Sequence, residues 1–105
     1  MTFKVRLTRQ AEADLERLFD FVLERELARD GGDLELAQEA LLAMRAGIET
    51  LQASPFTCRK AGRSPFLREL VIPFGHTGYI ALFEVEDAAT VTVLAVRHQL
   101  EDDYH

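Results

Sequence analysis

Apolar and polar residues alternate at the start of the chain. Phe3, Val5 and Leu7 occupy every second position between polar residues, and a period of two places such residues on one face of a strand. Thr8 follows this run, and its side-chain oxygen is well suited to cap the first turn of a helix. The sequence therefore predicts a strand with one buried face over residues 2–7, followed directly by a helix.

Two longer stretches carry apolar residues at the spacing of a helix, with charged residues between them. The first stripe consists of Ala11, Leu15, Leu18, Phe19, Val22, Leu23 and Leu27, and the second of Ala37, Ala40, Leu41, Met44, Ile48 and Leu51. Asp30-Gly31-Gly32-Asp33 separates the two helices, and Ser54-Pro55 ends the second, which begins at about Leu34. Paired glycines permit a left-handed turn, so we expect an antiparallel helical hairpin whose two apolar stripes also need a sheet to cover them.

Three strands are predicted in the second half of the chain, over 67–72, 79–85 and about 90–96. Turn residues separate them, with Pro73 and Gly75–Gly78 after the first strand and Asp87–Ala89 after the second. The last strand is apolar on both faces, which is typical of the centre of a sheet. Residues 55–66 form an irregular basic connection.

The predicted order is β-α-α-β-β-β. It indicates an α+β fold, in which an antiparallel helical hairpin packs on one face of an antiparallel sheet. The N-terminal strand is expected to join that sheet at an edge. A chain of 105 residues is the size of one domain, so we assign residues 1–105 to a single domain.

Composition indicates the cellular compartment in which the protein is expected. No apolar run approaches the ~18 residues that a membrane span requires, and no apolar leader follows Met1. The one cysteine, Cys58, excludes a disulfide within the chain and a zinc site built from several cysteines. We therefore expect a cytoplasmic protein without a membrane anchor.

Charge is distributed unevenly along the chain. The net charge is −6, yet Arg59, Lys60, Arg63 and Arg68 face only one acid, Glu69, between residues 55 and 80. An acidic chain is a poor general binder of nucleic acid, because that affinity comes largely from neutralised phosphates. The basic residues are either a solvated loop or a contact for an acidic partner.

Polar residues gather where the last strand ends. Arg97, His98 and Tyr104 surround three consecutive acids, Glu101, Asp102 and Asp103. With His98 and His105 these acids contain metal-ligand types, but consecutive acids near a terminus are more typical of a solvated segment. We expect neither a metal nor a cofactor.

Several segments together resemble the RelE/ParE superfamily of bacterial toxins from type II toxin–antitoxin pairs, and the ParE-like branch in particular. They are Lys4 to Leu18, the helix ending Ile48 to Pro55, Leu67 to Val71, Gly78-Tyr79, Phe83-Glu84-Val85 and Val96 to Tyr104. The resemblance covers essentially the full chain and depends on the order and spacing of these segments.

The resemblance implies a toxin that is neutralised by a cognate antitoxin, and it leaves two activities open. ParE-like members poison DNA gyrase and are not known as enzymes, whereas RelE-like members cut messenger RNA at the ribosome. A third possibility is a non-toxic relic that keeps the fold and binds an antitoxin without a cellular target. We favour the ParE-like interpretation, with DNA gyrase as the target.

The nuclease alternative requires a base, an acid and cations around the RNA phosphate. Arg68 matches one basic position of the RelE-like set, but Leu70 and Ile80 stand where the set has basic residues. Arg97 and Tyr104 approximate its terminal pair, with the spacing shifted by about one residue. The candidates for a nuclease are thus Arg68, Arg97, Tyr104 and also His98, whose ordinary pKa of ~6.5 suits an acid or a base.

The antitoxin is expected to fill a groove beside the sheet, by strand addition or with an apolar helix. The basic residues are candidate contacts for an acidic antitoxin, and apolar strand residues are candidates for the groove. The set consists of Arg59, Lys60, Arg63, Arg68, Leu70, Ile72, Ile80 and Leu82. The complex is expected to be a hetero-oligomer of toxin and antitoxin.

Overall fold

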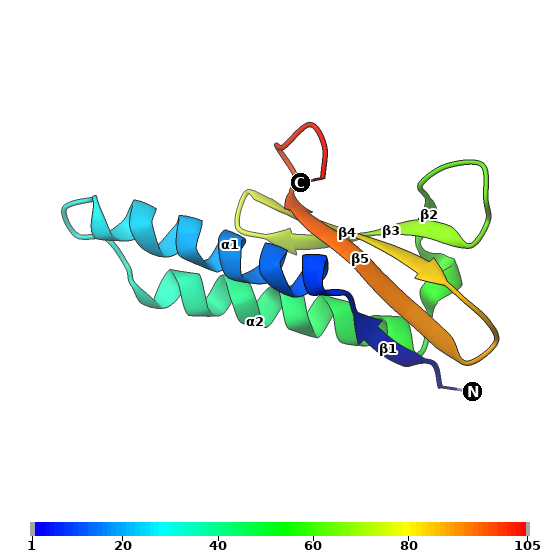
Figure 1. The fold of residues 1–105 in the computed structure, drawn as a ribbon. Helices are drawn as coiled ribbons and strands as arrows, with labels where there is room; N and C mark the ends of the chain where they lie inside the picture. The colour runs from blue at the N-terminus through cyan, green and yellow to red at the C-terminus, as the bar shows by residue number, and fades with distance from the viewer. Residues whose placement is uncertain (1, 105) are drawn as a thin grey trace.

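Five strands form one sheet, and two helices cover one of its faces (Figure 1). A computed structural model describes residues 2–104. The elements in chain order are β1 (Lys4–Leu7), α1 (Arg9–Leu27), α2 (Glu35–Glu49), β2 (Arg59–Lys60), β3 (Leu67–Phe74), β4 (Thr77–Val85) and β5 (Thr90–His98). Short 3₁₀ helices at Thr50–Gln52 and Pro55–Thr57 connect α2 to β2.

The order of strands across the sheet is β1-β5-β4-β3-β2. β3, β4 and β5 form the expected antiparallel meander. β1 lies at an edge, as predicted, and pairs with β5 in parallel, with Lys4 opposite Thr90. The α+β class and the hairpin on one face are confirmed, while this single parallel pair makes the sheet mixed rather than wholly antiparallel.

The helical hairpin forms where the apolar spacing predicts it. Thr8 caps α1, since its hydroxyl oxygen accepts a hydrogen bond from the Ala11 amide at 3.1 Å. Gly31 has a φ of +70° in the turn between the helices, a conformation that glycine adopts without strain. α2 is shorter than the predicted 34–53, because the chain tightens into a 3₁₀ turn after Glu49.

The end of β3 differs from the prediction. Pro73 was expected to end the strand, but it lies inside β3 and pairs with Gly78. The other neighbour, β2, reaches only Arg68 and Glu69, so β3 is an edge strand at Pro73. A proline is tolerated at an edge because no neighbour needs its missing N–H group.

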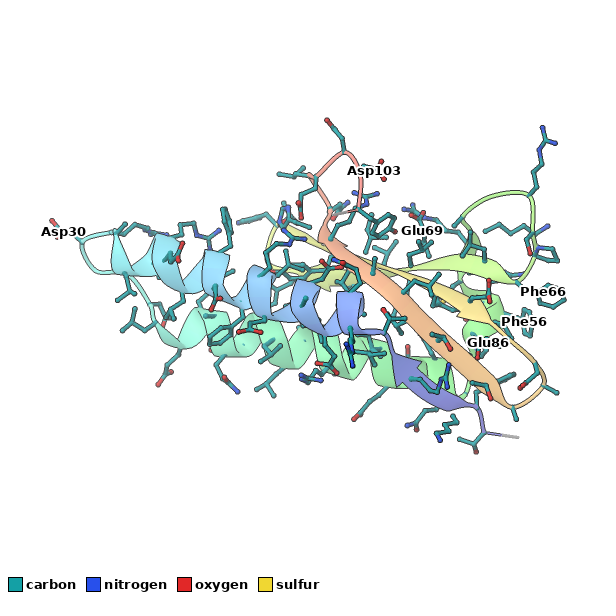
Figure 2. The ribbon with its side chains drawn as sticks, in the orientation of Figure 1. Asp30, Phe56, Phe66, Glu69, Glu86 and Asp103 are labelled. Carbon is teal, nitrogen blue, oxygen red and sulfur yellow. The ribbon has the colours of Figure 1, made fainter. Side chains whose placement is uncertain are left out.

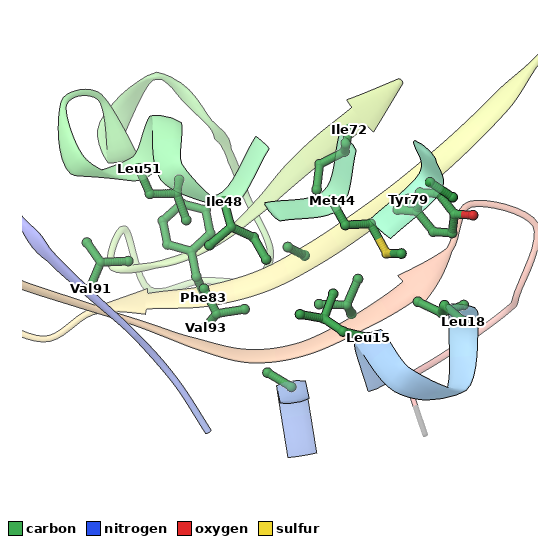
Figure 3. Packing of buried hydrophobic residues seen from close by; sticks show 14 of the residues in the cluster. Leu15, Leu18, Met44, Ile48, Leu51, Ile72, Tyr79, Phe83, Val91 and Val93 are labelled. Carbon is green, nitrogen blue, oxygen red and sulfur yellow. The ribbon is translucent and has the colours of Figure 1, made fainter. Parts of the chain in front are cut away.

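The core lies between the hairpin and the sheet (Figure 3). Leu15 of α1, Met44 of α2 and Phe83 of β4 are at most 1% exposed, and each such side chain contributes on the order of 1.5–3 kcal/mol. Leu27 was assigned to the apolar stripe, yet it is 62% exposed in the last turn of α1.

The molecule is elongated, with extents of 49 × 26 × 25 Å. The tip of the helical hairpin, marked by Asp30, projects beyond the sheet at one end, and Phe56 and Phe66 lie at the other end (Figure 2). Within residues 2–104, no helix is both long and apolar enough to cross a membrane.

Candidate functional site

A cleft of about 680 Å³ opens where the projecting half of α1 faces the turn between β3 and β4. Its apolar lining residues are Leu18, Phe21, Val22, Leu36, Phe74, Tyr79 and Leu100, and its polar ones include Arg17, Arg25, His76, Thr77, His98 and Glu101. Phe21 is 61% exposed and Leu100 is 74% exposed. Exposed apolar side chains around a concave surface are typical of a binding site for a partner or ligand.

The polar groups in the cleft are held by one another. The Tyr79 and His98 rings meet edge to face with centroids 5.6 Å apart. His98 Nε2 lies 3.0 Å from the Thr77 hydroxyl oxygen, and His98 Nδ1 accepts a hydrogen bond from the Leu100 amide. Burial raises the pKa of Tyr79, while the positive charge of Arg25 opposes the shift. The Tyr79 phenol is therefore neutral. His98, through its contacts with Thr77 and Leu100, fixes the chain that follows β5.

Polar side chains of α1 hydrogen-bond to β5 beside the cleft. Asp14 is 1% exposed, and its carboxylate accepts a hydrogen bond from the Val96 amide at 2.9 Å. Arg17 donates to the Val96 carbonyl and pairs with Glu101 at 3.3 Å. These contacts satisfy the edge of β5 beyond the short strand β1, so α1 takes the place of a neighbouring strand there.

A second polar cluster lies on the face of the sheet that the helices leave uncovered. The Arg97 guanidinium lies 5.1 Å from the centroid of the Tyr104 ring and donates to the Glu101 carbonyl. The Tyr104 hydroxyl donates to Glu69 Oε2 at 2.6 Å. Burial raises the pKa of Tyr104, and the hydrogen bond to Glu69 and its negative charge raise it further, while Arg97 opposes the shift. Tyr104 is thus a poor proton donor beside a carboxylate.

The four nuclease candidates do not come together. Arg97 and Tyr104 meet on the uncovered face, whereas His98 contacts Thr77 and Tyr79 on the helix-covered face. Arg68 lies near the far end of the sheet and donates to the carbonyls of three loop residues, Phe56, Cys58 and Pro65.

The antitoxin-binding candidates also divide between the two faces of the sheet. Ile72 is in the core and Leu70 packs against it, on the helix-covered face. Ile80 pairs with Arg97, and Leu82 pairs with Glu69, on the uncovered face. Ile80 is only 4% exposed.

The basic candidates are at the end of the sheet away from the cleft. Arg59 pairs with Glu69 at 3.1 Å, and Arg68 bonds to the loop. Lys60 and Arg63 are exposed, with no ion pair to either within residues 2–104.

Sequence reasoning missed the residues that make the cleft, above all Phe21 and Leu100. The available signal was an aromatic residue on α1 outside the apolar stripe: Phe21 follows Leu18 by three positions but was not assigned to the core.

Within residues 2–104, neither Cys58 nor a metal cluster adds a reactive centre. Burial raises the pKa of the Cys58 thiol, and this outweighs the opposing charge of Arg68. In the part of the chain that the structure describes, no group of three or more His, Cys, Asp or Glu side chains is placed to hold a metal ion. His105, one of the acidic tail's possible ligands, lies outside the described residues.

Comparison with known proteins gives concordant results. Residues 5–103 match the family model described as the ParE toxin of the type II toxin–antitoxin system parDE. The chain is 32% identical over 101 residues to a protein of Caulobacter vibrioides named Toxin RelE1, covering 96% of this chain and 98% of that protein. A solved structure titled "Chromosomal ParDE TA system from P. aeruginosa" superimposes with a TM-score of 0.71 at 21% identity, over 92% of this chain and 96% of that one.

Proposed function

The chain belongs to the ParE toxin family of type II toxin–antitoxin systems, and on that premise we propose that it is a cytoplasmic toxin that poisons DNA gyrase without catalysing a reaction of its own. A cognate antitoxin holds it inactive. Gyrase poisoning requires a surface that fits a large protein, whereas RNA cleavage requires an assembled set of acid, base and cations.

The division of the nuclease candidates carries this proposal. Within residues 2–104, Arg97 and Tyr104 are the only two of the four whose side chains contact each other, since Arg97 reaches His98 only at its backbone carbonyl. The Tyr104 hydroxyl is hydrogen-bonded to the carboxylate of Glu69. A carboxylate at this position repels an RNA phosphate. Arg68 has its guanidinium committed to loop carbonyls, and His98 lies on the other face. The geometry therefore favours a binding activity over a hydrolytic or transesterifying one.

The antitoxin site that the structure supports best is the cleft rather than the sheet residues named from sequence. Its exposed apolar rim, with Phe21 and Leu100, suits an apolar segment such as one face of a helix. Arg25 lines the cleft and shares the Glu26 carboxylate with Arg29, so the two arginines together leave a positive charge that suits an acidic residue of that segment. Phe21→Glu should weaken copurification of antitoxin by about tenfold or more, whereas Leu42→Glu, at an exposed apolar position of α2, should not. Equal copurification of both variants would exclude the cleft.

Substitution of Tyr104 by Phe separates poison from nuclease in cells. Tyr104→Phe removes the hydroxyl while the ring stays over Arg97, so the fold should persist. Expression without antitoxin should cause growth arrest with induction of the DNA damage response and intact messages, and Tyr104→Phe should retain it. If the unaltered chain caused cleavage of messenger RNA and the Tyr104→Phe variant did not, the protein would be a nuclease. If the unaltered chain caused no growth arrest, it would be a non-toxic relic.

A further inference from the structure

A second exposed surface lies at the end of the molecule away from the hairpin tip (Figure 2). Phe56 is 49% exposed and Phe66 is 51% exposed. Their rings meet edge to face at 6.4 Å, and Phe56 meets Phe3 in the same way at 6.5 Å. We call Phe3, Phe56, Phe66, Lys60 and Arg63 the aromatic–basic end.

This end is separate from the cleft. Phe66 directly precedes β3. Phe74, which lines the cleft, is the last residue of the same strand. Eight residue steps along a strand span roughly 26 Å. A segment bound in the cleft therefore leaves the aromatic–basic end to another partner.

The aromatic–basic end is held in a fixed shape before any partner arrives. The Arg68 guanidinium donates to the carbonyls of Phe56 and Cys58 at 3.1 and 2.6 Å, and to that of Pro65 at 2.6 Å. It also lies 5.1 Å from the centroid of the Phe56 ring. One arginine thus fixes both ends of the loop that carries the two exposed rings, which lowers the ordering cost of binding.

Its charge is opposite to that of the rest of the protein. Residues 55–68 contain four basic residues and no acid, whereas the rest of the chain contains eight basic and eighteen acidic residues, a net charge of −10. Arg59 is paired with Glu69, so Lys60 and Arg63 are the cations left to meet a partner's acids.

These features fit a protein segment better than a nucleic acid. Two available cations give a weak dependence of binding on salt, with a slope of about −2, whereas a protein with 6–10 phosphate contacts shows a several-fold steeper slope. Arg68 covers one face of Phe56, and the other rings meet at their edges, so they do not offer a row of free faces for stacked bases. An apolar anchor beside acidic residues matches both the rings and the two cations.

We propose that the aromatic–basic end is the surface by which the toxin docks on its protein target, and that it receives an acidic segment of that target with an apolar or aromatic anchor. The inference rests on the proposed function, because it takes the cleft as the antitoxin's site and gyrase as the target. An antitoxin in the cleft then blocks a large target by its bulk, without covering this end.

Two variants of the full chain test this docking surface, each with a matched control. Phe66→Ala and Arg63→Glu should each weaken inhibition of purified gyrase by at least about tenfold, the effect expected of an interface hot spot, and should relieve growth arrest. Leu42→Ala, at a 56% exposed position of α2, and Arg9→Glu, at an exposed position of α1, should match the unaltered chain. Both test variants should still copurify with antitoxin, which also reports an intact fold.

Each other outcome overturns the docking surface or its assigned occupant. Full growth arrest by both test variants would exclude the surface, even if the unaltered chain proved inactive on gyrase and the proposed function failed. Loss of antitoxin copurification by both would assign the surface to the antitoxin or to folding. The unaltered chain could instead bind fluorescent duplex DNA at micromolar concentration and lose this binding in Arg63→Glu. That result would show that the surface binds nucleic acid and not an acidic protein segment.

Discussion

Two buried carboxylates show how single residues hold the helices of this protein in place. Asp14 lies on α1 and accepts a hydrogen bond from the Val96 amide of β5. Glu26 is 3% exposed near the end of α1 and accepts one from the Asp33 amide at 3.1 Å, in the chain leading to α2. Each carboxylate thereby connects segments that belong to different elements.

Removing the Asp14 carboxylate should destabilise the protein. Asp14→Ala leaves the Val96 amide without its partner, and an unsatisfied buried donor costs about 1–3 kcal/mol. Urea denaturation should show a loss of this size in the free energy of unfolding. Asp20→Ala, at an exposed position of the same helix, should change it by less than about 0.5 kcal/mol. Similar losses in the two variants would contradict the role given to Asp14.

Glu26 should make stability depend on pH in the acid range. The hydrogen bond from the Asp33 amide lowers the pKa of Glu26 below its ordinary value of 4.5, and Arg25 and Arg29 lower it further, although burial opposes them. A lowered pKa means that the folded state favours the ionised form, so this stabilisation is fully present above about pH 4.5 and is lost as the pH falls through the lowered value.

Glu26→Gln should therefore lower the Tm at pH 7 and flatten its decline between pH 5 and pH 3. Glu39→Gln, at an exposed position of α2, should leave the pH profile of the Tm unchanged. Parallel profiles for the unaltered chain and Glu26→Gln would show that Glu26 does not contribute to the acid sensitivity.

At the scale of elements, α2 approaches β3 closely because Gly47 has no side chain. A Cβ atom at this position would lie 2.8 Å from Ile72 Cγ1. Gly47→Ala should thus cost about 1–3 kcal/mol through overpacking, although alanine is the better helix former by ~1 kcal/mol. Chemical denaturation should detect the loss.

Gly62→Ala is the control for Gly47→Ala, because a Cβ at Gly62 meets nothing within 4 Å. The Gly47→Ala variant could prove as stable as Gly62→Ala, or more stable than the unaltered chain. Either result would show that α2 can move away from β3 with little loss of stability.

Patterns of neighbouring residues in the sequence predicted the helices and most strands. They could not predict which distant segments pair in the sheet. The cap at Thr8 and the strands of the meander follow from nearby residues. The parallel pairing of Lys4 with Thr90 joins residues at opposite ends of the chain, and β2 has only two residues, so neither leaves a periodic pattern. The cleft also arises from tertiary structure, since α1 and the turn after Phe74 meet only in the folded chain.

One feature of the candidate site was nevertheless available from sequence. The turn between β3 and β4 has an even number of residues, both as predicted and as observed, and such a turn pairs even-numbered with odd-numbered positions. Leu70 therefore pairs with Ala81, and Ile80 pairs with Val71. This parity places Leu70 and Ile80 on opposite faces of the sheet, so the two side chains do not line one groove on a single face.

At the scale of the whole molecule, the length of β3 separates two surfaces of different chemistry. The cleft is mostly apolar and lies between α1 and the turn that follows β3. The aromatic–basic end lies beyond the start of β3. The uncovered face between them carries the Arg97–Tyr104–Glu69 cluster, whose groups are bonded to one another. Within residues 2–104 the four nuclease candidates are not assembled into one site, which agrees with the proposed binding activity.

Purified gyrase provides the most direct test of this account. Toxin freed of antitoxin is added to gyrase, plasmid and ATP, and both supercoiling and cleaved DNA are measured. We predict that micromolar toxin inhibits supercoiling and causes cleaved DNA to accumulate, and that Tyr104→Phe does the same. Unchanged supercoiling, together with cleavage of messenger RNA on ribosomes by the same preparation, would contradict the account and make Arg97 and Tyr104 residues of a nuclease.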